Sequence, residues 1–402
     1  MSEVQPLLDG LSFGESLRWH QDRLWLADWG AQEIVAVNRA GQPEVTARVE
    51  FPAFPMCIDW LPDGRLLIVA ARDGRLLRQE PDGSLVTHAD LSGLSERGYP
   101  WNEIVVDGRG NAYLNNQGFD FPGGKFAYGT IALLKPDGSA RLVADGIAFP
   151  NGMAVTPDNS TLIVAESYGQ KLTAFQISAD GRLSQPRVWA DLGEGVPDGI
   201  CLDAEGAVWY ADVPNKQCVR VREGGGVLQT IQLDRGCFSC ALGGPNRTTL
   251  FMVATQWRGA ERMTDRSRSG QLLTAQAPAA GVGWPLGNRR PSRARTAGPL
   301  LCPAGKGATG GVRGRPVPLT QGSGLRADRR PVGAVVSRAI PRAELIHGHE
   351  KRVCARRTRG PISARWGMSG GRGVSHSDLE RGRRSVDHAQ HLTPAPAAHR
   401  LG

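Results

Sequence analysis

Four residues with oxygen-bearing side chains recur at matched places in the sequence and could bind a metal ion together. They are Glu15, Asn102, Asn151 and Asp198, and each stands about ten residues before a short apolar run. Carboxylate and amide oxygens, without His or Cys, are the ligands that hard divalent cations such as Ca²⁺, Mg²⁺ and Mn²⁺ prefer. The cation would in turn offset the cost of burying two carboxylates. The alternative is that each side chain only caps a turn at the start of a strand.

The elements that must position these residues are repeated hairpins. The apolar runs follow one another at intervals of 42, 46, 50, 46 and 42 residues and begin at Leu24, Leu66, Ala112, Leu162, Val208 and Leu250. Repeats of roughly 40 to 50 residues with several short strands are typical of propellers and solenoids. No stretch of this region has sustained helical periodicity, and the hairpin-turn dipeptide Asp-Gly occurs nine times between Asp9 and Gly199. Six units closed into a ring leave no long exposed edge, so the sequence predicts an all-β, six-bladed β-propeller.

Each repeat is expected to run from an inner strand, through a turn and a second strand, to two outer strands. Because the innermost strands of a propeller line its central channel, residues at matched positions of these strands meet near the channel mouth. The four oxygen-bearing residues stand where inner strands begin, and we therefore expect them to share one site. Residues 3–10 are expected to close the ring by pairing with the last strand, residues 270–275.

The charge of the chain is divided unevenly. Residues 288–402 carry a net charge of +17 and one aromatic residue, Trp366, which leaves −8 for residues 1–287. We expect residues 1–287 to form the propeller, and residues 288–402 to be a disordered, basic, Arg/Gly/Pro-rich tail. The composition of this tail also fits an out-of-frame read-through of GC-rich DNA, which is the reading we favour. A nucleic-acid-binding arm is the third alternative, which we disfavour.

Several classes of protein are disfavoured by the sequence. The N-terminus lacks the basic and apolar segments of a signal peptide, and no run of 18 apolar residues occurs. We therefore expect a cytoplasmic protein without a membrane partner. Seven scattered Cys argue against a disulfide framework. Residues 1–287 contain only His20 and His88, and neither begins an inner strand, which leaves few candidates for a His-activated nucleophile.

Four motifs give the sequence a resemblance to a known family. They are Gly14-Glu15-Ser16-Leu17-Arg18-Trp19, Phe149-Pro150-Asn151-Gly152, Pro197-Asp198-Gly199-Ile200-Cys201-Leu202-Asp203 and Ser239-Cys240-Ala241-Leu242-Gly243-Gly244. Through them, residues from about 10 to 285 resemble the senescence marker protein / gluconolactonase / luciferin-regenerating enzyme family. The resemblance implies a six-bladed propeller with one divalent metal in its channel, and an activity among lactonases and related ester hydrolases.

Carried over to this sequence, the resemblance implies that Glu15, Asn151 and Asp198 are metal ligands. It also implies that Asp198 is the general base and that Asn102 contacts the substrate or the metal. The implied cofactor is one divalent ion, with Ca²⁺ as the first choice and Mg²⁺, Mn²⁺ or Zn²⁺ as alternatives. The implied reaction is hydrolysis of a small-molecule lactone or related cyclic ester by metal-activated water. The alternative is a non-catalytic, metal-binding propeller that acts as a binding or regulatory module.

One position departs from the pattern of the sugar-lactone members, which place an Arg two residues before the amide that corresponds to Asn102. Pro100 occupies that position here, so the sequence disfavours an aldonolactone substrate. A more apolar or aromatic acyl group is predicted by four substrate-contact candidates: Tyr99, Trp101, Phe119 and Phe121. The alternative is that these aromatic residues pack within the blades.

Overall fold

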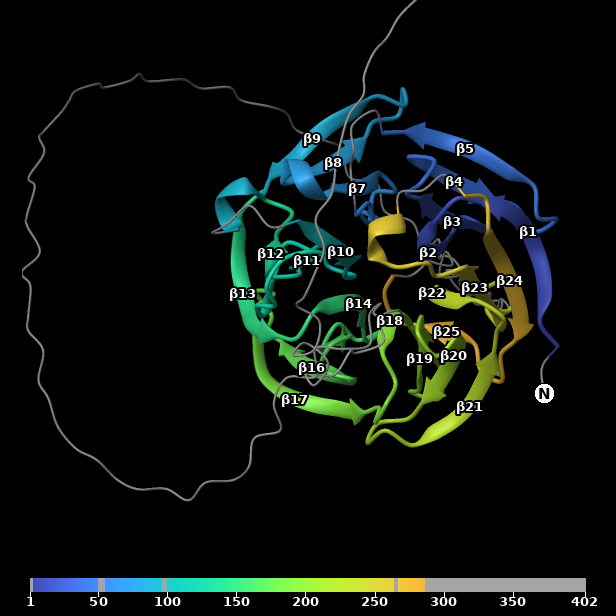
Figure 1. Ribbon diagram of the computed structural model, residues 1–402. Coiled ribbons are helices and arrows are strands. Elements are labelled where there is room, and N and C mark those ends of the chain that lie inside the picture. The colour runs from blue at the N-terminus through green and yellow to red at the C-terminus, as the bar shows by residue number, and fades with distance from the viewer. Residues whose placement is uncertain (1–2, 50–54, 96–99, 264–266, 286–402) are drawn as a thin grey trace, which may run out of the picture. The chain divides into compact units, whose positions relative to one another are not determined.

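The computed structural model describes residues 3–49, 55–95, 100–263 and 267–285. Over these residues the chain forms six antiparallel sheets, or blades, arranged in a ring around a central channel (Figure 1). The predicted all-β, six-bladed propeller is confirmed. Helical structure in the described part of the chain consists of three short 3₁₀ turns: Ala71–Asp73, Ser92–Leu94 and Ala260–Arg262. The expectations about residues 288–402 lie outside the described residues and stay predictions.

In five blades the four main strands run in chain order from the channel to the rim, and in the last blade β22, β23 and β24 do so before β1 takes the outermost place. The inner strands are β2 (Gly14–His20), β6 (Ile58–Trp60), β10 (Trp101–Val106), β14 (Pro150–Val155), β18 (Pro197–Asp203) and β22 (Gly236–Gly243). The second strands are β3 (Arg23–Asp28), β7 (Leu66–Ala70), β11 (Ala112–Asn116), β15 (Thr161–Glu166), β19 (Val208–Asp212) and β23 (Thr249–Thr255). The third strands are β4 (Glu33–Val37), β8 (Arg75–Gln79), β12 (Gly129–Leu134), β16 (Lys171–Ile177), β20 (Gln217–Val221) and β24 (Gly270–Gln276). The outermost strands are β5 (Pro43–Arg48), β9 (Leu85–Asp90), β13 (Ala140–Ile147), β17 (Leu183–Asp191), β21 (Val227–Gln232) and β1 (Gln5–Leu11).

The ring is closed by the N-terminal strand, as the sequence predicts. Strand β1 pairs antiparallel with β24, with Gln5 opposite Thr274 and Leu11 opposite Gly270. The last blade therefore combines residues from both ends of the propeller, which lie side by side in Figure 1. This pairing covers the edge of β24 and ties the first described residues to the last blade.

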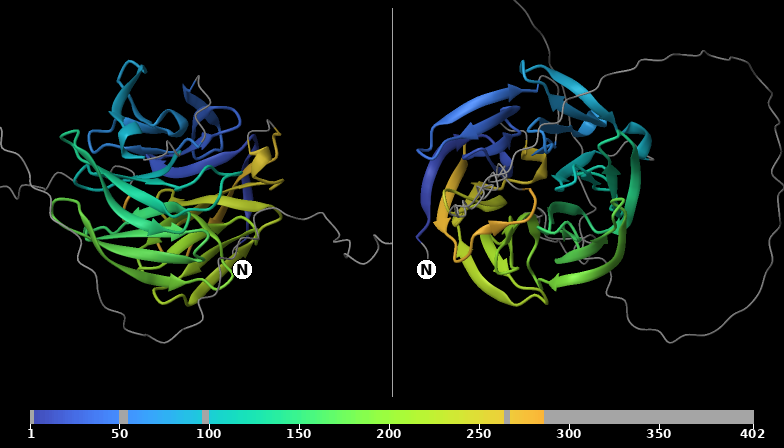
Figure 2. Two further views of the ribbon diagram at one scale, coloured as in Figure 1. Left: turned by 60° about the vertical axis from the view of Figure 1, so that its left-hand side comes forward. Right: turned by 180° about the vertical axis from the view of Figure 1, so that it is seen from behind.

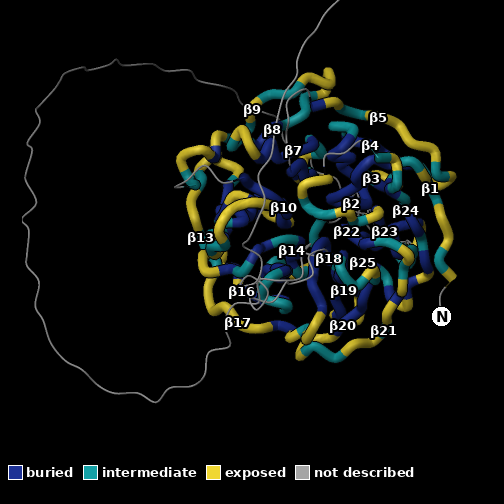
Figure 3. Tube along the Cα trace, in the orientation of Figure 1, coloured by how far each residue is buried: buried dark blue, intermediate teal, exposed yellow. Residues whose placement is uncertain are grey.

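Burial falls from the channel to the rim (Figure 3). All residues of β2, β7 and β19 are buried, whereas β5 and β21 are largely exposed. Apolar side chains of neighbouring blades pack against each other and form the core between the sheets. The stacked sheets are seen from the side in Figure 2. Inner strands thus have rigid neighbours on both sides, which fixes the side chains that they direct into the channel.

One short strand was not predicted. After β24 the chain continues to β25 (Gly281–Val282), which pairs with the far end of β18 and adds a fifth strand to that blade. Trp284 then exchanges two backbone hydrogen bonds with Val155, at 2.8 and 3.1 Å. Two residues are too few to show a periodic pattern, so the sequence gives no signal for this strand.

Candidate functional site

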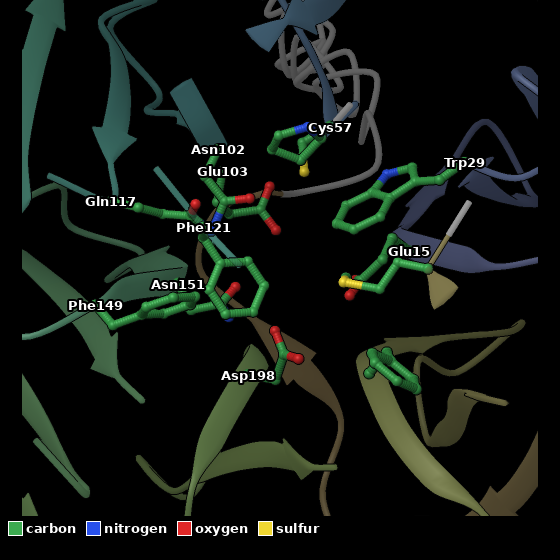
Figure 4. A pocket seen from close by; sticks show the side chains of 13 residues that line it. Glu15, Trp29, Cys57, Asn102, Glu103, Gln117, Phe121, Phe149, Asn151 and Asp198 are labelled. Carbon is green, nitrogen blue, oxygen red and sulfur yellow. The ribbon is translucent and has the colours of Figure 1, made fainter. Parts of the chain in front are cut away.

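A small cavity lies where the inner strands begin, and it contains most of the predicted site residues (Figure 4). Its volume of about 40 Å³ is enough for an ion and a few water molecules, or for one polar group of a ligand. The polar residues that line it are Glu15, Asn102, Glu103, Gln117, Asn151 and Asp198. The other lining residues are Trp29, Pro55, Cys57, Phe121, Phe149, Phe238 and Met263.

Irregular strand pairing places the polar side chains at this cavity. In β14, Pro150 lies opposite Glu166 and the next regular pair begins at Met153, so Asn151 falls within the irregularity. The pairing of β18 is interrupted in the same way at Asp198, that of β10 at Asn102, and that of β2 directly after Glu15. An extra residue in a strand leaves the ladder locally unpaired and redirects the side chains there. A repeated bulge thus directs residues of four blades toward one point.

Two glycines allow the inner strands to approach closely beside the candidate ligands. A Cβ atom on Gly152 would lie 2.5 Å from the backbone oxygen of Asp198 and 2.7 Å from the nitrogen of Ile200. A Cβ atom on Gly199 would lie 2.6 Å from Oγ of Ser239. The glycines that follow Asn151 and Asp198 are therefore required by the contact between neighbouring blades, because any side chain would push these strands apart.

A chain of hydrogen bonds links the candidate residues of three blades. The backbone N–H of Glu103 donates to Oδ1 of Asn115 at 3.1 Å, and Nδ2 of Asn115 donates to the backbone oxygen of Asn151 at 2.7 Å. Nδ2 of Asn151 then donates to Oγ of Ser167 at 3.4 Å, and that hydroxyl donates to the backbone oxygen of Pro197 at 2.7 Å. In this network Nδ2 of Asn151 donates a hydrogen bond within the protein. The amide is thereby oriented so that Oδ1 is available to bind a cation.

The two candidate carboxylate ligands are buried and repel each other. Glu15 and Asp198 are 6% and 5% exposed. Burial raises the pKa of Glu15 well above its usual value, and the charge of Asp198 raises it further. Burial likewise raises the pKa of Asp198, followed by the charge of Glu103, while a hydrogen bond from the Asn151 side chain acts in the opposite direction. Since ionised carboxylates in such a place need a compensating positive charge, the cavity is suited to a cation.

The chemistry of this donor set fits a divalent cation. No Lys, Arg or His is among the described residues that line the cavity, so an ion would supply the missing positive charge. Within the described part of the chain no three His, Cys, Asp or Glu side chains converge closely enough to hold an ion by themselves. A cation here would therefore depend on the Asn151 oxygen beside Glu15 and Asp198, with water for the remaining positions. All-oxygen coordination of this kind is typical of Ca²⁺ and Mg²⁺.

Glu103 is a third carboxylate of the cavity, and it was missed by the sequence analysis. Its Oε1 accepts hydrogen bonds from Nη2 of Arg18 at 2.9 Å and from the backbone N–H of Ile104 at 3.0 Å. A third, longer contact to Oε1 comes from Oγ of Ser16 at 3.4 Å. All three contacts use the same oxygen, and Figure 4 shows the carboxylate directed toward the cavity. In a regular strand the side chains of Asn102 and Glu103 would point to opposite faces of the sheet. Because the bulge interrupts this alternation, both side chains line the cavity.

The predicted substrate contacts divide into two groups. Asn102 and Phe121 line the cavity, whereas Trp101 and Phe119 are buried but do not line it. Trp101 directly precedes Asn102 in β10 and is 1% exposed, but it is not among the described residues that line the cavity. Phe119 packs behind the cavity wall, with its ring centroid 6.2 Å from that of Phe121 and 5.7 Å from that of Phe149. Tyr99 lies outside the described residues.

The apolar wall of the cavity comes mostly from residues that the sequence analysis did not single out. Phe149 has a positive φ of 57° and stacks on Tyr168 at a centroid distance of 4.7 Å. Trp29 donates from Nε1 to the backbone oxygen of Met56 at 2.6 Å. Phe238 of the neighbouring blade lies on the same side, because both rings pack against Phe13, at centroid distances of 5.4 Å for Trp29 and 4.6 Å for Phe238. Phe149 belongs to one of the quoted motifs, two residues before Asn151. Its closeness to Asn151 in the sequence could therefore have indicated that it lies at the cavity. The positions of Trp29 and Phe238 depend on loops and on blade packing.

None of the helices in the described residues is long and apolar enough to cross a membrane.

Together these features define a six-bladed β-propeller whose channel holds a carboxylate–amide site. Residues 13–256 match the model of the SMP-30/Gluconolactonase/LRE-like region. The chain belongs to this family, and the suspected resemblance is confirmed.

Individual relatives are distant. Regucalcin of Xenopus laevis is 32% identical over 132 residues, which are 31% of this chain and 44% of that protein. The 6-deoxy-6-sulfogluconolactonase of Pseudomonas putida is 27% identical over 187 residues, which are 42% of this chain and 64% of that protein. The match therefore spans less than two thirds of either relative. The solved structure of a luciferin-regenerating enzyme has the same fold, with a TM-score of 0.59 at 19% identity over 70% of this chain and 99% of that one.

Proposed function

We propose that this protein hydrolyses a lactone or related cyclic ester with the help of one divalent cation held by Glu15, Asn151 and Asp198. The observation that carries the proposal is the meeting of these three side chains, from three different blades, in one buried cavity without a basic residue among its described lining. Family membership supports it, because a relative named as a sugar-lactone hydrolase matches this chain. Ca²⁺ is our first choice, since the donors are oxygens.

A bound divalent cation would supply the positive charge that polarises the lactone carbonyl and favours ionisation of water. The Asp198 carboxylate would accept the proton of the attacking water. Oxygen from water then bonds to the carbonyl carbon, the bond from that carbon to the ring oxygen breaks, and the ring oxygen takes up the proton, which gives a hydroxy acid. Asn102 and Gln117 line the same cavity, and their amides can hydrogen-bond to the ester oxygens.

Ser12 is the rival nucleophile that the sequence pattern offers. Gly10-Leu11-Ser12-Phe13-Gly14 has the Gly-x-Ser-x-Gly pattern of serine hydrolases. In those enzymes the serine stands at a turn from a strand to a helix, whereas Ser12 lies between β1 and β2. Its backbone N–H is bound to Oδ2 of Asp28 at 2.9 Å. Ser12 is also absent from the described lining of the cavity, so we assign it no catalytic role.

The apolar wall favours an uncharged substrate with an apolar substituent. Trp29, Phe121 and Phe149 surround the acidic centre, and the cavity itself is too small to hold more than the reacting group. The body of the substrate would then lie against these rings. The Pseudomonas putida relative is named for a sulfonate-bearing sugar lactone, whereas the described lining of this cavity offers a sulfonate no Lys, Arg or His. We therefore expect an aromatic or alkyl-substituted lactone to be the better substrate.

The test is a panel of aromatic, aliphatic and sugar lactones, assayed with metal-free protein and after addition of Ca²⁺, Mg²⁺, Mn²⁺ or Zn²⁺. We expect turnover that depends on the cation and is highest for the aromatic or alkyl lactones.

Asp198→Asn should lower kcat by about a thousandfold or more, whereas Asp191→Asn, at the exposed end of β17, should leave it unchanged. Cation binding without turnover of any ester would favour the alternative, a non-catalytic binding or regulatory propeller. Cation-independent turnover would contradict the proposed mechanism.

A further inference from the structure

The three blades that carry the candidate metal ligands share a feature that the other blades lack. Their second strands end in an acidic residue, and this residue is paired with the residue directly before the ligand. Asp28 lies opposite Gly14, Glu166 opposite Pro150, and Asp212 opposite Pro197. The next residues along these inner strands are Glu15, Asn151 and Asp198. The register is thus the same in all three blades.

Each of these carboxylates holds the backbone that leads into the inner strand. Oδ2 and Oδ1 of Asp28 accept the N–H groups of Ser12 and Phe13, both at 2.9 Å. Oε2 of Glu166 accepts the N–H of Ala148 at 2.9 Å. These donors come two or three residues before Glu15 and Asn151, so each bond fixes the backbone just before a ligand.

The third blade repeats the arrangement. Oδ2 of Asp212 accepts the N–H of Val196 at 3.3 Å, two residues before Asp198. Asp212 also accepts hydrogen bonds from the side chains of Asn215 and Gln217, which hold its carboxylate in place. Asp28, Glu166 and Asp212 are all nearly inaccessible to solvent, with exposed fractions of 4%, 3% and 0%. A buried, charged acceptor is a strong anchor for a backbone N–H.

The remaining blades have neutral residues at the corresponding place. In the third blade Asn116 lies opposite Trp101, and in the sixth Thr255 lies opposite Gly236. The second strand of the second blade ends at Ala70. Acidic anchors therefore occur in the blades that supply Glu15, Asn151 and Asp198, and a neutral residue occurs in each of the others. A general requirement of propeller folding would apply to all six blades, so the distribution points to the site.

We propose that Asp28, Glu166 and Asp212 are positioning residues for the cation, each holding in place the backbone that presents one of its ligands. This inference rests on the proposed function, because it takes Glu15, Asn151 and Asp198 as the ligands. The three anchors would act in two ways. They fix the ligand geometry before the ion binds. The negative charges of Asp28 and Asp212 also add to the attraction for a cation, whereas the charge of Glu166 is partly offset by Lys171, whose Nζ lies 3.4 Å from Oε1.

The experiment measures Ca²⁺ binding to the full chain by calorimetry, with Asp28→Asn, Glu166→Gln and Asp212→Asn made singly. Each substitution keeps the size of the side chain and removes its charge. We expect the Kd for Ca²⁺ to rise by about ten- to one-hundred-fold in each variant. Thr255→Val, at the equivalent place in a blade without a ligand, is the matched control and should leave the Kd unchanged. Glu166→Asp, which keeps the charge, should recover part of the affinity.

Denaturant unfolding of the metal-free variants separates positioning from a purely structural role. A structural role predicts lower stability of the variants with an unchanged Kd, and that result would overturn the inference. If Asp212→Asn does not fold, Asp28→Asn and Glu166→Gln decide the matter, because each concerns a different ligand. Failure of the unaltered protein to bind Ca²⁺, Mg²⁺, Mn²⁺ or Zn²⁺ would overturn the proposed function and this inference with it. Normal binding by the unaltered protein and by all three variants would overturn this inference alone.

Discussion

At the end of the channel where the inner strands begin, the cavity is lined by three carboxylates and three amides. At the end where the same strands finish, a second small cavity is lined mostly by apolar side chains, with two thiols and two arginines. The first end has a bulge in five of its inner strands, β2, β10, β14, β18 and β22, whereas the second is covered by β25 and Trp284. The same strands thus bring candidate oxygen ligands together at one end and mostly apolar side chains together at the other.

Strand β2 shows the difference within seven residues. Glu15 stands at its start and His20 at its end, and both side chains are buried. Burial disfavours the charged form of each group, so it raises the pKa of Glu15 and lowers that of His20 to about 4. His20 is then simply neutral at pH 7 and stacks on Trp60 at a centroid distance of 4.2 Å. Glu15 instead faces further carboxylates, which is costly without a cation. Burial alone therefore does not identify a site; convergence of like charges does.

The largest effect is expected from Gly152→Ala at the acidic end. The new Cβ atom would lie 2.5 Å from the backbone oxygen of Asp198 and 2.9 Å from Cα of Gly199, so β14 and β18, which carry two of the candidate ligands, would have to separate. We expect a loss of about 3 kcal/mol in the free energy of unfolding and loss of detectable Ca²⁺ binding, measured by denaturant titration and calorimetry.

Gly93→Ala is the matched control for this change. No atom of the described part of the chain lies within 4 Å of the Cβ position at Gly93, and the φ of Gly93 is not in the left-handed region. Stability and Ca²⁺ affinity should both stay close to those of the unaltered protein. Unchanged Ca²⁺ binding in Gly152→Ala would show that close approach of β14 and β18 is not needed for the site.

The opposite end should respond to mutation without any change in cation binding. The ring of Trp284 packs directly against Gly108, where a Cβ atom would lie 2.5 Å from Cζ2 of the indole. We expect Trp284→Ala to lower the free energy of unfolding by about 3 kcal/mol and to leave the Kd for Ca²⁺ unchanged. Nε1 of Trp284 is buried and has no hydrogen-bond partner among the residues that the structure describes, so Trp284→Phe, which keeps a ring and removes this N–H, should cost much less. Weaker Ca²⁺ binding in Trp284→Ala would contradict the independence of the two ends.

The contrast between the two ends also shows what the sequence could reveal. Blade number, ring closure and the starts of the inner strands follow from local signals, namely apolar runs at regular intervals and turn residues between them. These signals were enough to bring Glu15, Asn102, Asn151 and Asp198 to one cavity. Their roles as metal ligands, general base and substrate contact are proposals.

Other features could not be read from the sequence because they depend on geometry between elements. Glu103 reaches the cavity through a bulge, which breaks the alternation that a strand pattern predicts. The rings of Trp29 and Phe238 are brought to the wall by blade packing, and β25 is too short to give a pattern. Trp101 shows the opposite case: a residue next to a predicted contact was included, although it is not among the described residues that line the cavity.

The smallest effect is expected from His20, and it appears only in the pH dependence of stability. The pKa of His20 is about 4 in the folded protein, below the value of about 6.5 for an unfolded chain. Between these values the unfolded chain binds a proton that the folded protein does not bind, so stability falls as the pH falls from 6.5 to 4. The free energy of unfolding at pH 5 should be about 2 kcal/mol lower than at pH 7.5.

His20→Phe keeps a flat ring against Trp60 and should remove this part of the pH dependence, as measured by denaturant unfolding at each pH. The control is His88→Phe, at the other His of residues 1–287, which is half-buried. This substitution should change the pH dependence of stability less than His20→Phe does. An equal change in both variants would show that burial of His20 at the closed end of the channel does not cause the pH dependence.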